Sequence, residues 1–333
     1  MKKSPVCLLA VFLVMGLCLT RCGTGSGPPK PSSEGSIQIA VIPKGTTHEF
    51  WKAIHAGAVK AAGEMGVEIF WKGPQKEDDR AQQIQVVEDF VSRGVDGIVL
   101  APLDDRALMI PVRDATHEGI PVVIIDSDLQ GEEYISFVAT DNYKGGVLAA
   151  RAMGDKLREG GRIFLVRYQE GSASTTKRET GFLDTITAEY PKISIMVQDL
   201  FAGATTETAF QFGENLLSRF PDVDGIFCPN ESTTFGMLRA LQESGRAGQV
   251  AFIGFDSSPK LVAGLSNGEI HGLVLQDPVK IGYLGVKQMV FHLRGQFVES
   301  RVDTGVYLAT PENMNEPLIQ SLLSPELADI LDK

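Results

Sequence analysis

The segment IQIAVIPKGTTHEFW, residues 37–51, is the most informative part of the chain. Its apolar run, 37–42, predicts a buried parallel strand, and the break at Pro43 and Gly45 separates this strand from a helical pattern that starts near Glu49. A strand that feeds a helix through a polar turn is the opening unit of an open α/β sheet, where ligands bind beyond the carboxyl ends of the strands. That end carries cations, hydroxyls and two aromatic rings, which are Lys44, Thr46, Thr47, His48, Phe50 and Trp51.

Strands and helices alternate along the rest of the chain. Strands are predicted at 67–71, 96–100, 120–125, 162–166, 193–197, 223–228, 250–255 and 273–275. Helices are predicted at 50–65, 81–93, 105–118, 145–158, 174–190, 206–219 and 281–294, with two more ending at 244 and 266. This alternation is typical of parallel, right-handed βαβ units. A single sheet of all these strands would be unusually wide, so the sequence predicts two similar α/β lobes.

Composition restricts the class of protein. Apolar residues make up 43% of the 333 residues and charged residues 22%, which is typical of a soluble globular protein with two domains. The formal net charge is -11, and the first 21 residues hold three basic residues and no acidic ones, so the remainder is more acidic still. Because such a surface repels phosphate backbones, we expect no nucleic acid among the partners.

The first residues have the pattern of an export signal. Lys2 and Lys3 precede an uncharged, mostly apolar stretch from Val6 to Thr20, which predicts a signal peptide over residues 1–21. Residues 19–22, Leu-Thr-Arg-Cys, resemble the lipobox of bacterial lipoproteins, with Arg21 where a small residue is usual. The resemblance implies lipidation of Cys22, and plain signal cleavage is the alternative. We expect a protein of the periplasm or of the outer face of a bacterial membrane, attached by a lipid only.

The segment that follows the signal peptide, and the positions of the four cysteines, agree with an exported protein. Residues 22–36 are small, polar and Pro-rich, as in a flexible tether. Cys7 and Cys18 lie in the signal peptide, so Cys228 has no cysteine to pair with if Cys22 carries a lipid. The sequence therefore predicts a fold without disulfides, in which Cys228 is a buried structural thiol.

Polar side chains follow four apolar strands directly, where the chain leaves the sheet: Asp126, Asn230, Asp256 and Gln276. Carboxylates and carboxamides can each bind two neighbouring hydroxyl groups. The alternative is that they cap the helices that follow. Together with the aromatic residues after the first strand, the four favour a crevice for a polyhydroxylated ligand.

Eight segments carry a resemblance to a known family. They are IAVIPKGTTHEFW (39–51), VDGIVLAP (95–102), IPVVIIDSD (120–128), ATDNYKGG (139–146), KRETGF (177–182), PDVDGIFCPNE (221–231), FIGFDSSP (252–259) and LVLQDP (273–278). In this order, across about residues 37–308, they resemble the type I periplasmic sugar-binding proteins of the ribose/galactose group. The resemblance implies an α/β fold of two Rossmann-like lobes with parallel sheets joined by three hinge crossovers.

The resemblance also implies how the chain is divided and what it does. Residues 37–140 plus 277–303 would form the N-terminal lobe, and residues 141–276 plus 304–333 the C-terminal lobe. The lobes would close over one sugar or polyol, without cofactor or metal, and the monomeric protein would deliver it to the permease subunits of an ABC importer.

The ligand-binding residues that the resemblance implies come from both lobes. They are Lys44, His48, Phe50, Trp51, Asp126, Ser127, Arg178, Asn230, Asp256 and Gln276. Ribose-type members have an arginine at Ser127, an asparagine at His48 and a small hydroxyl residue at Lys44. They also have an aromatic residue from the second lobe, for which the nearest position here is Ala204.

These departures leave two kinds of ligand open. Lys44, His48 and Arg178 could favour a ligand with a carboxylate or phosphate. Alternatively, Lys44 points to solvent and His48 donates to a neutral hydroxyl group.

The sequence also bears on three other functions. An enzyme is not indicated, since the chain lacks H-E-x-x-H, G-x-S-x-G and a P-loop lysine, and its five histidines lack metal-ligand spacing. A repressor of the lactose type would need a basic helix-turn-helix ahead of residue 37, where this chain has an export signal. A binding protein that presents its ligand to a chemoreceptor or sensor kinase remains an alternative to transport.

Overall fold

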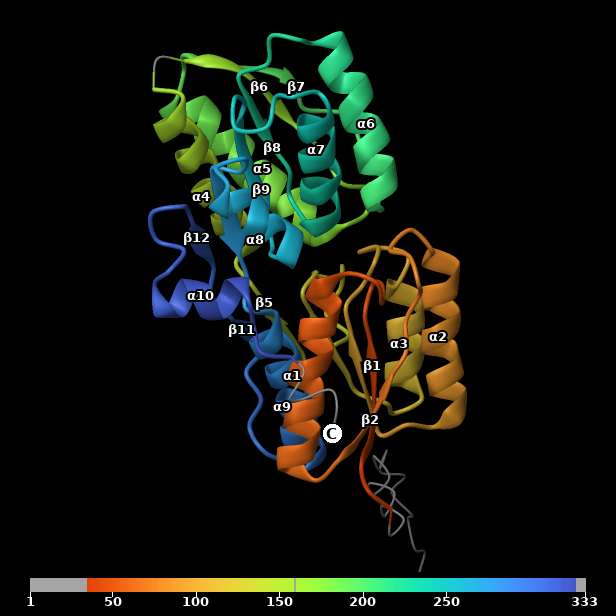
Figure 1. Cartoon of the computed structure of the whole chain (residues 1–333). Helices are drawn as coiled ribbons and strands as arrows, with labels where there is room; N and C mark the ends of the chain where they lie inside the picture. Colours follow the sequence, from red (N-terminus) through yellow and green to blue (C-terminus); the bar gives the residue numbers. More distant parts are fainter. Residues whose placement is uncertain (1–34, 159, 328–333) are drawn as a thin grey trace, which may run out of the picture. The chain divides into compact units, whose positions relative to one another are not determined.

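The computed structural model describes residues 35–158 and 160–327 and contains two six-stranded sheets (Figure 1). The first sheet has the order β11-β5-β4-β3-β1-β2. Its strands, all parallel to their neighbours, are β1 (Gln38–Ile42), β2 (Glu68–Trp71), β3 (Gly97–Leu100), β4 (Val122–Ile125), β5 (Ser136–Ala139) and β11 (Arg301–Asp303).

The second sheet repeats this arrangement in the order β12-β10-β9-β8-β6-β7. Its strands are β6 (Gly161–Leu165), β7 (Ile193–Val197), β8 (Gly225–Phe227), β9 (Ala251–Phe255), β10 (Gly272–Leu275) and β12 (Tyr307–Ala309). They pair in parallel except at the edge, where β12 runs antiparallel to β10.

Helices cover both faces of each sheet. On the first sheet, α1 (Glu49–Met65) and α9 (Pro278–Leu293) pack side by side on one face, and α2 (Arg80–Arg93) and α3 (Met109–His117) on the other (Figure 1). On the second sheet, one face is covered by α4 (Asn142–Lys156) and α5 (Ala173–Glu189). The other is covered by α6 (Thr206–Arg219), α7 (Glu231–Glu243), α8 (Pro259–Ser266) and α10 (Pro317–Leu323). We call the first sheet with its helices lobe 1 and the second with its helices lobe 2.

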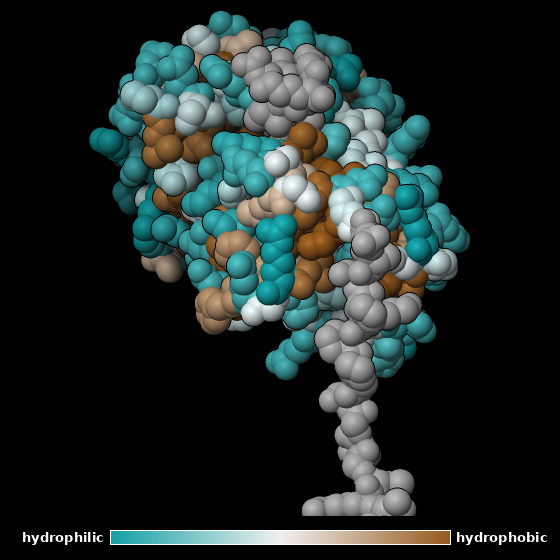
Figure 2. Space-filling view, turned by 90° about the horizontal axis from the view of Figure 1, so that it is seen from below, coloured by the Kyte–Doolittle hydropathy of each residue, from teal (hydrophilic) through white to brown (hydrophobic). Residues whose placement is uncertain are grey.

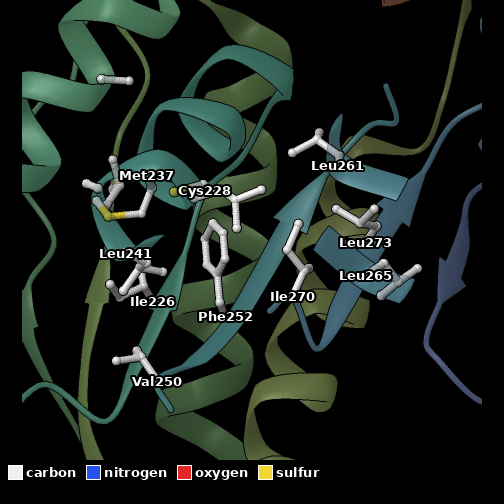
Figure 3. Close-up of a cluster of buried hydrophobic side chains, with 14 of the residues drawn as sticks. Ile226, Cys228, Met237, Leu241, Val250, Phe252, Leu261, Leu265, Ile270 and Leu273 are labelled. Carbon is white, nitrogen blue, oxygen red and sulfur yellow. The ribbon is translucent and has the colours of Figure 1, made fainter. Parts of the chain in front are cut away.

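The cores explain why the strands are continuously apolar. In β1, Ala40 and Ile42 face the core under α2 and α3, whereas Ile39 and Val41 face the core under α1 and α9. Neighbouring residues of a strand point to opposite faces, and here both faces are buried. Figure 3 shows one core of lobe 2, in which Cys228 and Phe252 lie among aliphatic side chains. Cys228 is a buried free thiol, as predicted.

The chain passes between the lobes three times: between β5 and α4, between β10 and α9, and between β11 and β12. This confirms the predicted fold of two Rossmann-like lobes joined by three crossovers. The exact lobe boundaries stay a prediction. The signal peptide, Cys22 and the tether up to residue 34 lie outside the described residues.

Most predicted strands and helices are present, with shifted ends. The prediction missed β5, a four-residue strand between two polar loops. The helix predicted from 105 starts only at Met109, because the Asp104 carboxylate accepts the backbone N–H groups of Arg106 and Ala107 and forms a turn first. Conversely, α4 starts at Asn142, three residues earlier than predicted, because Asp141 caps it by accepting from the N–H of Lys144.

Close contact between α4 and α5 positions the start of α5. Gly146 on α4 lies against the backbone of Arg178 on α5, and a Cβ at this glycine would stand 1.9 Å from the Arg178 carbonyl oxygen. Reciprocally, a Cβ at Gly181 would stand 2.2 Å from the carbonyl oxygen of Tyr143. The missing side chains allow the helices to approach and bring Arg178 toward the ends of the strands.

Among the helices of residues 35–158 and 160–327, none combines the length and apolar character needed to cross a membrane. On the face seen in Figure 2, hydrophilic residues surround smaller apolar patches.

Candidate ligand-binding site

Two aspartates occupy matching places in the lobes, directly after β4 and β9. Asp126 and Asp256 have φ angles of 61° and 68°, in the left-handed region that few residues other than glycine adopt. Aspartate tolerates this conformation better than most residues, because its short side chain can bond locally. Both carboxylates are buried at the carboxyl ends of the strands. Such strain held in place by surrounding structure is a feature of functional sites.

A cavity between these strand ends has a volume of about 330 Å³ with its open mouth included. Nine of the ten predicted ligand-binding residues line it: Lys44, His48, Phe50, Trp51, Asp126, Arg178, Asn230, Asp256 and Gln276. The prediction missed five further lining residues, which are Glu77, Tyr168, Ser174, Thr175 and Glu231.

Ser127 is the predicted residue that is absent from this lining. Its side chain is fully buried, and its Oγ accepts the backbone N–H of Ser174 at 3.1 Å, at the start of α5. The structure thus places Ser127 behind the wall, where it holds Ser174 of the other lobe. Direct binding of ligand by Ser127 stays a prediction.

Lys44 does not point to solvent, so that expectation is wrong. Its side chain is buried, with Nζ 2.9 Å from Oδ2 of Asp126. The same ammonium group donates to Oγ of Ser174 in lobe 2 at 3.1 Å. Lys44 therefore neutralises Asp126 and connects the two lobes.

His48 faces a carboxylate that the sequence did not reveal. Its Nδ1 lies 2.6 Å from Oε1 of Glu77. Burial by itself would lower the pKa of His48, but Glu77, with Glu231 and Asp256, raises it to about 9. Burial opposes ionisation of Glu77, yet His48, Tyr168 and Trp51 lower its pKa to about 2. The structure thus pairs an imidazolium with a carboxylate at neutral pH.

Aromatic rings reach the cavity from both lobes. Phe50 and Trp51 meet edge to face, with ring centroids 5.0 Å apart, and the indole N–H of Trp51 donates to Glu77. Tyr168 lies in lobe 2 and donates its hydroxyl to the same carboxylate. Ala204, the nearest position to the second-lobe aromatic residue of ribose-type members, does not line the cavity, whereas Tyr168 of lobe 2 does. The available signal was its position two residues beyond the predicted strand 162–166.

Two buried polar atoms of the cavity residues lack a hydrogen-bond partner. Arg178 donates through Nε to Asn142 Oδ1 at 2.7 Å and through Nη1 to the carbonyl of Pro229 at 2.9 Å, but its Nη2 is unpaired. Gln276 donates to Oδ1 of Asp256 at 2.7 Å, and its Oε1 is unpaired. Buried polar groups are rarely left unsatisfied. A hydroxyl group, which both donates and accepts, is complementary to this donor and acceptor.

Asn230 and Glu231 combine structural and site roles. Asn230 caps α7 by accepting from the N–H of Thr233, so the capping alternative holds for this residue, although it also lines the cavity. Glu231 accepts the backbone N–H groups of Phe50 at 3.0 Å and Glu49 at 3.3 Å, at the start of α1 in lobe 1. Burial raises the pKa of Glu231 to about 7 despite the nearby His48.

Comparison with known proteins identifies the family. Residues 39–297 match a family model described as a periplasmic binding protein domain. The chain belongs to this family. Within residues 35–158 and 160–327, this periplasmic binding protein has no group of His, Cys, Asp or Glu that could hold a metal ion.

Three relatives illustrate the similarity. The ribose import binding protein of Bacillus subtilis is 28% identical over 316 residues, which cover 93% of this chain and 99% of that protein. A carbohydrate transporter solute-binding protein of Agrobacterium radiobacter, solved in complex with D-arabinose, is 34% identical with a TM-score of 0.84 and covers 88% of this chain and 100% of its own. An ABC transporter solute-binding protein of Agrobacterium vitis with bound D-fucose is 37% identical, with a TM-score of 0.83. The match covers 86% of this chain and 100% of that protein.

The His48–Glu77 pair predicts a pH dependence of stability. The pKa of His48 is 6.5 ordinarily and about 9 in the folded protein. Its contribution to the free energy of unfolding is therefore complete below pH 6.5 and is lost as the pH rises through about 9. Circular dichroism melts should therefore show the Tm of this periplasmic binding protein falling over that range. The Tm of the His48→Gln variant should fall less. An equal fall in both proteins would mean that another group is responsible.

Proposed function

We propose that the chain is an extracytoplasmic binding protein that captures a monosaccharide or similar polyhydroxylated ligand and delivers it to an ABC importer. The observation that carries this proposal is the unpaired donor of Arg178 and the unpaired acceptor of Gln276, at a cavity lined by aromatic side chains from both lobes. The names of the relatives, which refer to ribose import, D-arabinose and D-fucose, support the same ligand class. In this function the chain binds its ligand and does not transform it.

The charge balance of the cavity favours a neutral ligand over a sugar acid. Lys44 is paired with Asp126 and His48 with Glu77. Arg178 is stabilised in its charged form mainly by Asp256 and then by Asp126, although burial lowers its pKa. Because carboxylates already offset the three cations, an acidic ligand would bring a surplus of negative charge into a buried site.

Closure of the lobes would trap the ligand. Asp126, Phe50 and Trp51 reach the cavity from lobe 1, and Arg178, Asn230 and Asp256 from lobe 2. A ligand that contacts both sides shifts the population toward the closed arrangement. We assign residues 37–140 plus 277–303 to one moving body and 141–276 plus 304–333 to the other.

The proposal includes the site of action. After cleavage of the signal peptide 1–21, a lipid on Cys22 and the tether 22–36 would attach a monomeric binding protein to the outer face of a membrane. There it would meet the permease subunits of its importer. Presentation of the ligand to a chemoreceptor or sensor kinase is the alternative, and deletion of the permease genes followed by uptake and chemotaxis assays would separate the two.

The ligand class can be tested in two steps. Native mass spectrometry of the purified protein should show a co-purified neutral molecule of monosaccharide mass. Thermal-shift assays on the stripped protein should then show stabilisation by neutral sugars, such as D-arabinose, D-fucose or D-galactose, since a ligand that binds only the native state raises the Tm by mass action.

The matched control is the uronic acid of each neutral sugar, for example D-galacturonate against D-galactose. We expect little or no shift with the acids. A larger shift with an acid would overturn the neutral-ligand assignment and make Lys44, His48 and Arg178 determinants of an anion site. No shift with any sugar or polyol would overturn the sugar proposal as a whole.

A further inference from the structure

Four consecutive residues of lobe 2, Tyr168–Gly171, each form a hydrogen bond with lobe 1. The Tyr168 hydroxyl donates to Oε2 of Glu77, and Gln169 Nε2 donates to the Glu77 backbone carbonyl at 2.9 Å. The Glu170 carbonyl accepts from Arg80 Nη2 at 2.7 Å. The Gly171 carbonyl accepts the N–H of Asp105 at 2.9 Å. We call residues 168–171 the latch segment.

The fit of Gly171 shows how closely the latch segment contacts lobe 1. This glycine has a φ of 87°, and a Cβ there would stand 2.2 Å from Oδ2 of Asp104, which is paired with Arg80 at 3.0 Å. A larger residue would therefore be strained by its backbone angle and would also collide with lobe 1. The contact is direct and leaves no space between the lobes at this point.

Glu77 is the residue of lobe 1 on which the latch segment converges. Its carboxylate accepts from His48 and Trp51 within lobe 1 and from Tyr168 across the interface. Glu77 is held as a carboxylate and burial raises the pKa of Tyr168 far above its ordinary value, so the phenol remains a donor. One carboxylate thus fixes the orientation of Trp51 and also binds the opposite lobe.

We infer that the latch segment, with Glu77 as its acceptor, holds the lobes together independently of ligand and thereby sets how long a bound ligand stays. This inference rests on the proposed function. A hydrogen bond between lobes that exists only on closure stabilises the closed state and not the separate lobes. Glu77 and Tyr168 are therefore positioning residues, whose loss should speed ligand dissociation and, by increasing the open fraction of the ligand-free protein, should also speed association.

The test is the Tyr168→Phe variant, which removes the hydroxyl and keeps the ring. In this variant Glu77 keeps its hydrogen bonds with His48 and Trp51, so the structure of lobe 1 should remain intact. The matched control is Tyr143→Phe, because the Tyr143 hydroxyl donates to Asp184 at 3.0 Å within lobe 2 alone. In the full chain, which has two tryptophans, Trp71→Phe makes Trp51 the single fluorescent reporter in all variants.

Stopped-flow fluorescence would measure association and dissociation of D-arabinose and D-fucose. We expect Tyr168→Phe to raise the dissociation rate about 10-fold, the lower end for a hydrogen bond to a charged group, and Tyr143→Phe to leave it unchanged. Without sugar, acrylamide should quench Trp51 more strongly in Tyr168→Phe than in the control, because the closed population falls. Glu77→Gln should also speed dissociation, and adding Tyr168→Phe to it should have less than the additive effect.

The outcomes separate the latch from the ligand proposal. A lower Tm in Tyr168→Phe with unchanged dissociation and unchanged quenching would overturn the latch, since the contact would then be structural only. If neither sugar binds the protein that carries only Trp71→Phe, the choice of ligand fails. Quenching of ligand-free Trp51 still decides the latch in that case, with equal quenching in Tyr168→Phe and Tyr143→Phe counting against it.

Discussion

Replacing Asp256 by alanine is expected to weaken sugar binding by about 100-fold or more. Its carboxylate accepts the backbone N–H of Glu231 at 3.0 Å and the Gln276 amide at 2.7 Å, and it is the principal charge that stabilises Arg178. Removing one partner from a buried, hydrogen-bonded charge network costs on the order of 2–5 kcal/mol. The change also frees Gln276 to turn away from the cavity. Isothermal titration calorimetry with the sugar found in the thermal-shift screen would measure the loss.

The companion variant Asp256→Gly separates the side chain from the backbone. At a φ of 68°, alanine lowers the free energy of unfolding by roughly 1–2 kcal/mol relative to glycine, which adopts this angle without strain. Both variants should therefore lose a similar amount of affinity, whereas Asp256→Ala should have the lower Tm. Unchanged affinity in both variants would remove Asp256 from the site.

Replacing Gly146 by alanine is expected to cause the largest loss of stability among these variants. The added Cβ would stand 1.9 Å from the backbone oxygen of Arg178, which cannot move without shifting α5. Overpacking of this kind costs about 3 kcal/mol, equivalent to a fall in Tm of roughly 6–12 °C for a domain of about 150–250 residues and less if the two lobes unfold together. Because Arg178 moves with α5, sugar affinity should fall as well. Thermal unfolding and calorimetry on the same sample would check both effects.

The same substitution at Gly63 is the control. Gly63 lies within α1, and an added Cβ there meets no atom within 4 Å. Alanine at an exposed helical glycine should stabilise by about 0.5–1 kcal/mol, since it restricts the unfolded chain and favours the helix. If Gly146→Ala proved as mild as Gly63→Ala, the close packing of α4 on α5 would not position Arg178.

Most of the candidate site could be predicted because it follows from the topology of parallel sheets. Asp126 and Asp256 each come directly after an apolar strand, and the carboxyl ends of parallel strands share one edge. Arg178 could be predicted only through the family resemblance, because an arginine near the start of a helix otherwise indicates a solvent-exposed side chain.

Two of the residues that were missed, Glu77 and Glu231, have roles that depend on the opposite lobe. Glu77 lies in a loop of charged residues, KEDD at 76–79, which by sequence alone indicates solvent exposure. In the structure it is buried, and its carboxylate accepts the hydroxyl group of Tyr168 of lobe 2, about ninety residues later in the chain. By sequence alone, Glu231 is an acidic residue in the first turn of α7. In the structure its carboxylate accepts the backbone N–H of Phe50 at the start of α1. No local pattern encodes such pairs.

The amino-acid sequence was sufficient for most of the strands and helices, for the two α/β lobes and for the polar residues at the ends of the strands. These features depend on local apolar periodicity and on short-range capping. Only the folded structure shows that Lys44 neutralises Asp126, that His48 is held as a cation by Glu77 and that Arg178 and Gln276 keep one unpaired atom each. Charge state and hydrogen-bonding capacity depend on burial and on neighbours distant in sequence, which are defined when the two lobes meet.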